Sequence, residues 1–325
     1  MKILVTGSAG HLGEALMRTL PQLGHEVIGL DIKPSSFTHE VGSIADPAIV
    51  RGCFAGVDAV LHTATLHKPH VMSHPRQAFV DTNVTGTLIL LEEAVAAGVG
   101  AFVYTSTTSA FGRALTPRDG DPAAWITEDV VPRARNIYGA TKVAAEDLCE
   151  LVGRDHGLPC LILRTSRFFP EPDDSEQVRA GYADPNAKVN ELLYRRIDLS
   201  DVVTAHVAAL ESAPRIGFGR YVVSATTPFA PGDLAELRRN APAVVERLFP
   251  DYTDVYARLG WRMFPGIDRV YVNARAREEL GWEPRYDFRH AIDLLRAGGV
   301  PRSTLATSVG AKGYHPETTG PYTTR

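Results

Sequence analysis

The chain has 325 residues, of which 44% are hydrophobic and 22% charged, and its formal net charge is -4. These are ordinary values for a globular protein, and a chain of this length can bury one large core together with a smaller lobe. The mild acidity gives no reason to expect a nucleic acid or an anionic membrane as a partner.

Cysteine content and hydropathy exclude several other classes. Cys53, Cys149 and Cys160 are too few and too scattered for a disulfide framework or a metal cluster, so no metal site is expected. No charged and apolar leader precedes the first strand, so no signal peptide is predicted. The longest apolar stretch, 88–103, is interrupted by two glutamates and cannot span a bilayer. The sequence therefore predicts a cytoplasmic protein.

The N-terminus has the pattern of a dinucleotide-binding strand, turn and helix. Residues 3–5 are an apolar run typical of a strand buried on both faces, and an amphipathic helix is predicted over 12–23. Gly7, Gly10 and Gly13 lie between them at G-x-x-G-x-x-G spacing. One glycine allows the tight turn, one lets the backbone approach a pyrophosphate, and one lets helix and strand pack closely. The helix N-terminus then offers free N–H groups to the phosphates.

The second predicted strand, 27–31, ends in Asp31, about 20 residues after the glycines, as in dinucleotide-binding proteins. A carboxylate here accepts hydrogen bonds from the adenosine ribose and repels a 2′-phosphate, so the predicted cofactor is NAD rather than NADP. Lys33 is close enough to soften that repulsion. A ligand-free glycine turn is the alternative, but the strand–helix–strand context favours dinucleotide binding.

The chain continues with alternating strands and helices. Strands are predicted over 58–62, 101–106 and 160–164, helices from Asp46 and over 75–97 and 137–155, and loops over 33–42 and 113–135. This alternation predicts an α/β fold with a Rossmann-like, doubly wound parallel sheet. Ligands of such sheets bind at the carboxyl ends of the strands.

The pattern becomes irregular after Arg164. A helix over 201–211 and a strand over 221–224 are expected to return to the main sheet, and a smaller C-terminal substrate lobe is expected to follow. The expected domains are an NAD-binding Rossmann domain over 1–165 to which 197–226 returns, a substrate lobe from 166–196 and 227–300, and an irregular tail over 301–325. Within the lobe, a strand is predicted near 269–272 and a helix over 274–280.

Tyr138 and Lys142 form a Y-x-x-x-K pair at the start of a predicted helix. Their spacing puts both side chains on one face, one turn apart. A phenol with a pKa of about 10 is a poor base at neutral pH, and a nearby ammonium or an oxidised nicotinamide stabilises its phenolate. Such a tyrosine can take the proton of an alcohol as the carbon gives up hydride. The alternative is that Tyr138 and Lys142 share a helix by chance. The nucleotide-binding motifs that precede them favour a functional pair.

In this order the motifs resemble the extended short-chain dehydrogenase/reductases, the NAD-dependent epimerase/dehydratase family. The matching segments are 6–13, Asp31, 58–62 with Ala64, 83–87, 105–112, 138–142, 163–164, 196–201 and 280–284.

The resemblance implies roles for these positions. Thr107 would hydrogen-bond the reacting oxygen of the substrate, Tyr138 would be the acid/base, Lys142 would also hold the nicotinamide ribose, and Asn83 would lie near the catalytic centre. A strand-end threonine that caps local backbone is the alternative for Thr107. The implied cofactor-binding residues are Gly7, Ala9, Gly10, His11, Leu12, Gly13, Asp31, Ile32, Ser43, Ile44, Thr63, Ala64, Thr65, Tyr138 and Lys142.

Departures from the family pattern narrow the reaction. Dehydratases of the family carry an Asp-Glu pair just after the catalytic threonine, and Thr108 and Ser109 occupy those places here, so dehydration is not predicted. Ser43 stands where relatives often have an acid, which weakens the match at the adenine pocket. Residues 169–172 are similar to a segment of uronate dehydrogenases.

The candidate substrate residues are His67, Ser106, Thr108 and Arg167. Arg167 stands where many relatives have asparagine, and it is a candidate clamp for a carboxylate or a phosphate. Pairing with Glu171 or Asp173 is the alternative. His67 belongs to a loop with two other basic residues that lacks acidic or cysteine ligands for a metal, which favours a solvated or substrate-facing loop. The remaining histidines, including His206, are predicted to lie at the surface.

The predicted function is that of an NAD-dependent oxidoreductase that removes hydride from a hydroxyl carbon of a sugar-like or polyhydroxylated small molecule. An NAD-dependent sugar or nucleotide-sugar 4-epimerase with retained cofactor is the alternative, and a non-catalytic NAD-binding sensor is a remote one. The resemblance implies a substrate smaller than a nucleotide sugar, because relatives that bind UDP- or TDP-sugars have a longer interval than 165–195 and because the acidic residues here would repel a diphosphate. The resemblance also implies a possible homodimer.

Overall fold

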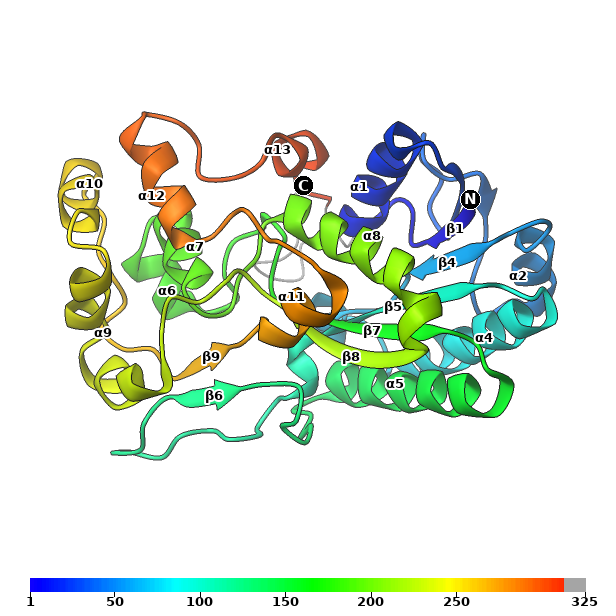
Figure 1. The fold of residues 1–325 in the computed structure, drawn as a ribbon, viewed down its shortest axis with the longest axis horizontal. Helices are drawn as coiled ribbons and strands as arrows, with labels where there is room; N and C mark the ends of the chain where they lie inside the picture. The colour runs from blue at the N-terminus through cyan, green and yellow to red at the C-terminus, as the bar shows by residue number, and fades with distance from the viewer. Residues whose placement is uncertain (313–325) are drawn as a thin grey trace.

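The computed structural model describes residues 1–312, and its main sheet has seven parallel strands in the order β3-β2-β1-β4-β5-β7-β8. The strands are β1 (Lys2–Thr6), β2 (Glu26–Asp31), β3 (Glu40–Val41), β4 (Ala59–His62), β5 (Ala101–Thr107), β7 (Cys160–Thr165) and β8 (Phe218–Val223). Figure 1 shows this sheet on one side of the molecule and a smaller lobe on the other. The predicted Rossmann-like, doubly wound sheet is confirmed.

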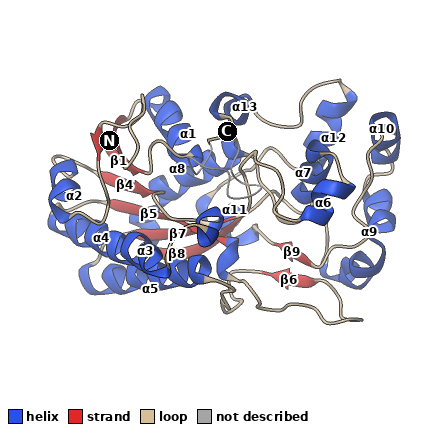
Figure 2. Cartoon of the chain, turned by 180° about the vertical axis from the view of Figure 1, so that it is seen from behind, coloured by secondary structure: helices blue, strands red, loops and turns tan. Residues whose placement is uncertain are grey.

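Helices cover both faces of the sheet, which explains why its central strands are nearly continuous apolar runs. Figures 1 and 2 show the two layers from opposite sides. One layer contains α1 (His11–Thr19) and α8 (Leu199–Ile216), and the other contains α2 (Pro47–Cys53), α4 (Gly86–Ala96) and α5 (Ile137–His156). The strand order reverses between β1 and β4, and this is where such sheets bind ligands.

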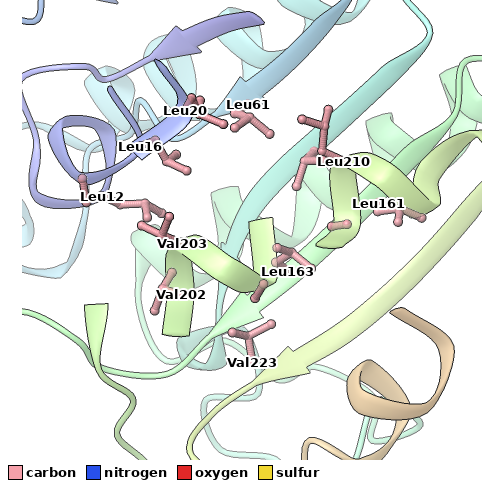
Figure 3. Packing of buried hydrophobic residues seen from close by; sticks show 14 of the residues in the cluster. Leu12, Leu16, Leu20, Leu61, Leu161, Leu163, Val202, Val203, Leu210 and Val223 are labelled. Carbon is pink, nitrogen blue, oxygen red and sulfur yellow. The ribbon is translucent and has the colours of Figure 1, made fainter. Parts of the chain in front are cut away.

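The first layer packs through leucine and valine side chains (Figure 3). Leu16 of α1 and Val203 of α8 belong to the same buried cluster as Leu61 of β4 and Leu163 of β7. Burying one such side chain contributes about 1.5–3 kcal/mol. This packing fixes α1 on one face of the sheet, and therefore holds the glycine turn at the carboxyl end of β1.

The helix predicted over 75–97 is continuous but changes its winding. It runs through α3 (Arg76–Phe79), a π-helical segment η3 (Val80–Thr85) and α4. Single π turns inside α-helices frequently lie at functional sites, and η3 contains Asn83.

The smaller lobe combines helices with a two-stranded sheet. The helices are α6 (Glu176–Gly181), α7 (Asp184–Leu192), α9 (Leu234–Leu248), α10 (Tyr252–Leu259) and α12 (Phe288–Arg296). The strands β6 (Ala124–Ile126) and β9 (Arg269–Tyr271) pair in parallel, and α11 (Ala274–Leu280) packs against α8 and β8. The prediction of a loop throughout 113–135 is wrong, because β6 lies within it and is held by a partner distant in sequence.

The prediction of an irregular tail over 301–325 is wrong in its first part. Helix α13 (Thr304–Val309) begins after Ser303, whose hydroxyl accepts the N–H of Ala306 at 3.0 Å, and it packs against α1 and α8. The remaining part of that prediction, 313–325, lies outside the described residues. The predicted loop over 33–42 similarly contains the short strand β3.

Within residues 1–312, none of the helices combines the length and the apolar character that crossing a bilayer requires.

Candidate active site

A cavity of about 660 Å³ lies at the carboxyl ends of the strands and extends to the smaller lobe. Of the residues predicted to bind cofactor, its wall includes Gly7, Ala9, Gly10, His11, Leu12, Gly13, Asp31, Ile32, Ser43, Ile44, Thr63, Ala64, Thr65 and Tyr138. The candidate substrate residues His67, Ser106, Thr108 and Arg167 also line it. The structure therefore brings most of the predicted site together at the point where the strand order reverses.

The glycine turn has the geometry that a dinucleotide requires. Gly7 has a φ of +74°, and a Cβ on Gly13 would lie 1.8 Å from the carbonyl oxygen of Gly7. Gly10 is the N-cap of α1, and because glycine has no side chain, it leaves the helix N-terminus uncovered. The first turn of α1 lines the cavity, so its N–H groups and the partial positive charge of the helix suit a pyrophosphate.

Asp31 is held firmly at the end of β2. Its Oδ2 accepts the N–H of Ala9 at 3.0 Å, and its Oδ1 accepts the N–H of Lys33 at 2.9 Å. The carboxylate therefore lies between the glycine turn and the loop after β2, on the cavity wall. This is the position in which an acid accepts hydrogen bonds from the adenosine ribose.

We expect Asp31→Ala to weaken NADH binding about 10–100-fold, because hydrogen bonds to a charged acceptor are lost. NADPH binding should weaken less, since repulsion of its 2′-phosphate is lost as well. Titration of both reduced cofactors by fluorescence measures the two affinities. Lys33→Ala is the matched control and should widen the discrimination. Tighter binding of NADPH than NADH by the unmodified protein would contradict the assignment of Asp31.

Thr107 and Tyr138 meet at the cavity wall. Thr107 ends β5, and Tyr138 lies in the first turn of α5, whose N-terminus is capped by Asn136 through the N–H of Gly139 at 3.1 Å. Burial raises the pKa of Tyr138 to about 12, and a hydrogen bond with the Thr107 side chain acts in the opposite direction. The Thr107 hydroxyl also accepts the N–H of Ser109 at 3.1 Å, so it caps the local turn as well.

Lys142 lies one turn after Tyr138 but behind the cavity wall. Its Nζ donates to the carbonyl of Thr105 at 2.7 Å and lies 4.0 Å from the centre of the Tyr104 ring. Burial lowers the pKa of Lys142 to about 7, while the carboxylate of Glu146 opposes this change. Among the described residues that line the cavity, Tyr138 is present and Lys142 is not.

We expect Lys142→Met to stabilise the protein in the absence of cofactor. The pKa of Lys142 falls from 10.5 to about 7 on folding. Between these pH values the unfolded chain binds the extra proton, so the stability of the unmodified protein rises with pH. The penalty is complete below pH 7, where it is at most about 5 kcal/mol, and it vanishes above pH 10.5.

Urea unfolding at pH 6, 8 and 10 tests this expectation. The gain from Lys142→Met should be largest at pH 6 and smallest at pH 10, with the exposed Lys33→Met as control. A loss of stability that is equal at all three values would show that the ammonium is not buried at a cost.

Among the described residues that line the cavity Asn83 is absent, and its side chain instead connects two neighbouring segments through hydrogen bonds. Its Oδ1 accepts the N–H of Leu66 at 2.8 Å and the hydroxyl of Thr65 at 2.9 Å. Its Nδ2 donates to the carbonyl of Leu66 at 2.9 Å and to Thr141 Oγ1 at 3.0 Å. The amide therefore ties the loop after β4 to α5, and it positions the helix that carries Tyr138.

Ser106 lines the cavity, but its hydroxyl is engaged by a buried carboxylate. It donates to the carboxylate of Glu146, which also pairs with Arg164 at 2.7 Å, and both charged side chains are buried. Glu146 follows Lys142 by four residues on α5, so it lies on the same helix face. Glu146 is not among the residues predicted from the sequence. Its spacing of four residues from Lys142 does indicate that the two side chains share a helix face.

Arg167 lies on the cavity wall but is engaged by acids. It pairs with Asp173, with Asp174 at 3.0 Å and with Glu191 at 3.2 Å. The structure therefore shows the predicted alternative, pairing with Asp173. Glu171 instead contacts His11 Nε2 at 3.0 Å.

The segment before α6 also meets the end of the described chain. The N–H of Lys312 donates to Glu171 at 3.2 Å, and its ammonium contacts Glu14 of α1. Lys312 thereby reaches the cavity wall. No local sequence pattern indicated this contact.

Some histidines line the cavity, and others are buried in the core. His67 and His70 line the cavity with ring centres 4.6 Å apart. The surface prediction is wrong for His62, which is bonded to Thr6 at 2.7 Å. It is also wrong for His206, which is bonded to Thr105 at 2.8 Å and whose pKa burial lowers to about 4. Over residues 1–312, no group of three or more His, Cys, Asp or Glu side chains is arranged to hold a metal ion.

The glycine turn, the acid after β2 and the tyrosine helix are arranged as in dinucleotide-dependent oxidoreductases of the short-chain type. A family model described as the NAD dependent epimerase/dehydratase family matches residues 3–223. The chain belongs to this family, and it is an NAD-dependent enzyme of the extended short-chain dehydrogenase/reductase type.

Individual relatives carry different names. The chain is 27% identical over 337 residues to a 3-beta-hydroxysteroid dehydrogenase of Mycolicibacterium neoaurum, which covers 90% of this chain and 89% of that protein. It is 33% identical over 166 residues to the uncharacterized protein y4nG of Sinorhizobium fredii, but this match covers 50% of the chain and only 39% of that protein. Bacterial UDP-glucose 4-epimerases are also among the relatives.

Solved structures share the fold. A short-chain dehydrogenase/reductase superfamily protein from Agrobacterium tumefaciens, solved with bound NAD, superposes with a TM-score of 0.64 at 24% identity. The alignment covers 92% of this chain and 98% of that one. This likeness extends the family's fold from the sheet to the smaller lobe.

Proposed function

We propose that the protein is an NAD-dependent dehydrogenase that oxidises a hydroxyl-bearing carbon of a sugar-like or polyhydroxylated small molecule. The observation that carries this proposal is that Thr107 and Tyr138 lie together on the wall of a cavity that also contains the glycine turn. When bound, NAD accepts a hydride from the carbon that is oxidised.

The side chains divide the remaining work. The Tyr138 oxygen takes the proton of the substrate hydroxyl, and the Thr107 hydroxyl donates a hydrogen bond that holds the substrate oxygen beside it. Because the pKa of Tyr138 is raised to about 12, its phenolate must be stabilised by a nearby positive charge. When protonated, Lys142, one turn behind, supplies a positive charge that stabilises the phenolate. Asn83 fixes the helix that carries both residues.

The cavity favours a small and polar substrate. Its volume of about 660 Å³ lies within the range for a single drug-sized ligand, so a bound dinucleotide leaves limited room beside it. Arg167, Arg195 and Arg269 on the wall favour a polar compound over a steroid. The acidic residues of 165–195 are not an argument for a small substrate. Asp173 and Asp174 pair with Arg167, so their charges are not available to repel a diphosphate.

A sugar 4-epimerase is the second candidate, and relatives with that name favour it. Both reactions begin with the same oxidation, so net NADH formation separates them. The purified protein is incubated with NAD and a panel of free sugars, sugar acids and UDP-sugars while NADH absorbance is followed. Accumulation of NADH with a free sugar or sugar acid supports the dehydrogenase. Conversion of a UDP-sugar to its 4-epimer without NADH would contradict it.

A further inference from the structure

A buried carboxylate lies one turn after Lys142 on the helix that carries Tyr138. Glu146 is 1% exposed, and its spacing of four residues places it on the same face of α5 as Lys142. Among the described residues that line the cavity, Glu146 is absent. Its carboxylate can therefore influence the reaction only through neighbouring side chains.

Side chains from three strands fix the orientation of this carboxylate. Nε of Arg164, on β7, lies 3.1 Å from each of its oxygens, and Nη2 lies 2.7 Å from Oε2. The hydroxyl of Ser106, on β5, donates to Oε1, and Nε of Arg220, on β8, lies 3.6 Å from Oε2. A guanidinium that contacts both oxygens is the usual partner of an ionised carboxylate. Glu146 therefore carries a negative charge in a fixed position behind the cavity wall.

The other titratable side chains around Lys142 are uncharged near neutral pH. Within the described part of the chain, those that act on Lys142 from β4, β5 and α5, besides Tyr138 and Glu146, are His62, Tyr104 and Cys149. Burial lowers the pKa of the histidine and raises the pKa values of the phenol and the thiol, so their neutral forms are favoured. The Nζ of Lys142 donates to a backbone carbonyl, which is a dipole and not a full charge. Glu146 is therefore the group that favours the ammonium over the neutral amine.

We propose that Glu146 is a positioning residue of the reaction: its buried carboxylate keeps the ammonium of Lys142 charged, and that charge stabilises the phenolate of Tyr138. The ammonium is otherwise disfavoured, because burial lowers the pKa of Lys142 to about 7. The inference rests on the proposed function, because it assigns a further residue to the acid/base chemistry of Tyr138.

The direction of the effect identifies this route. A negative charge that acted directly on Tyr138 would oppose a second negative charge on the phenol and would raise its pKa. The same charge acting through Lys142 favours the ammonium and thereby lowers the pKa of Tyr138. Neutralising Glu146 should therefore raise the pKa of Tyr138, whereas loss of a direct effect alone would lower it.

Titration of Tyr138 in the full-length protein saturated with NAD tests this proposal without a substrate. The ultraviolet absorbance of tyrosinate is followed as the pH is raised, and the curve of the matching Tyr138→Phe protein is subtracted to isolate Tyr138. Glu146→Gln should move the midpoint upward by about half a pH unit or more. Glu146→Asp keeps the charge and should retain most of the unmodified behaviour. A midpoint that is unchanged or lower in Glu146→Gln would overturn the proposal.

Two further variants make the result specific. Glu150→Gln removes the acid one turn further along α5, whose side chain is 50% exposed, and should leave the midpoint unchanged. Glu146→Gln combined with Arg164→Met leaves no unpaired buried charge to destabilise the fold, and it should still raise the midpoint. Stabilisation by NAD confirms that each variant is folded. An equal upward movement in Glu150→Gln, or none in the double variant, would contradict the assignment to Glu146.

NADH formation with the panel of sugars and sugar acids separates this inference from the proposed function. If the midpoint rises in Glu146→Gln but no compound of the panel yields NADH, Glu146 supports an acid/base tyrosine and the dehydrogenase proposal fails. If NADH forms and the midpoint does not rise in Glu146→Gln, the dehydrogenase proposal stands and the inference about Glu146 fails.

Discussion

Tyr138→Phe is expected to lower the turnover number about 10²–10⁴-fold, the usual contribution of a positioned acid/base group. The substitution removes only the phenolic oxygen, so the fold and NAD binding should be retained. Steady-state rates are measured as a function of pH with the substrate found by the NADH assay. In the unmodified protein the oxidation rate should rise with pH, because burial holds the pKa of Tyr138 at about 12. This rise should be absent from the variant.

Tyr104→Phe is the matched control for this prediction. Tyr104 is wholly buried in β5, and within the described part of the chain its hydroxyl has no hydrogen-bond partner. The ring under Lys142 is kept in phenylalanine, so the activity should remain close to that of the unmodified protein. A near-normal rate in Tyr138→Phe, or an equal loss in both variants, would contradict the role of Tyr138.

Arg164→Met is expected to reduce the free energy of unfolding by about 3–5 kcal/mol, the usual cost of leaving a buried ion without its partner. The side chains of Arg164 and Glu146 are 4% and 1% exposed, and Arg164 contacts both oxygens of the carboxylate. Removal of the guanidinium therefore leaves the charge of Glu146 inside the protein. Urea unfolding near neutral pH measures the loss.

Two comparisons make this result specific. The surface pair of Arg51 and Glu93 has a similar contact of 2.8 Å but an arginine that is 72% exposed, so Arg51→Met should cost much less stability than Arg164→Met. Adding Glu146→Leu to Arg164→Met should recover part of the stability, since no unpaired charge is left. Equal losses of unfolding free energy for Arg164→Met and Arg51→Met would show that burial of the pair does not increase the cost of removing one partner.

The central sheet could be predicted because its signals are local. The strands β1, β4, β5 and β7 are short apolar runs, and each predicted bound lies within one residue of the observed one. The glycine turn and the Y-x-x-x-K spacing are also contained within a few residues. Such patterns are sufficient to place Gly7, Asp31, Thr107 and Tyr138 around one cavity.

Features that depend on tertiary partners could not be predicted in this way. The strand β6 has three residues, and α13 is a short Thr- and Ser-containing segment stabilised by its contacts with α1 and α8. The sequence around Arg167 is compatible both with binding of a ligand and with pairing to Asp174. Only the fold decides between them, and the same is true of the burial of His206.

The pairing of β6 with β9 has a consequence for synthesis of the protein. Ala124 and its partner Arg269 are 145 positions apart. At translation rates of about 5–20 residues per second, β9 is made roughly 7–30 seconds after β6. During that interval β7 and β8 are added to the strands already made, but the nascent chain still lacks Arg269 and Tyr271 of the cavity wall. The substrate side of the cavity is therefore completed only after all seven strands of the main sheet have been made.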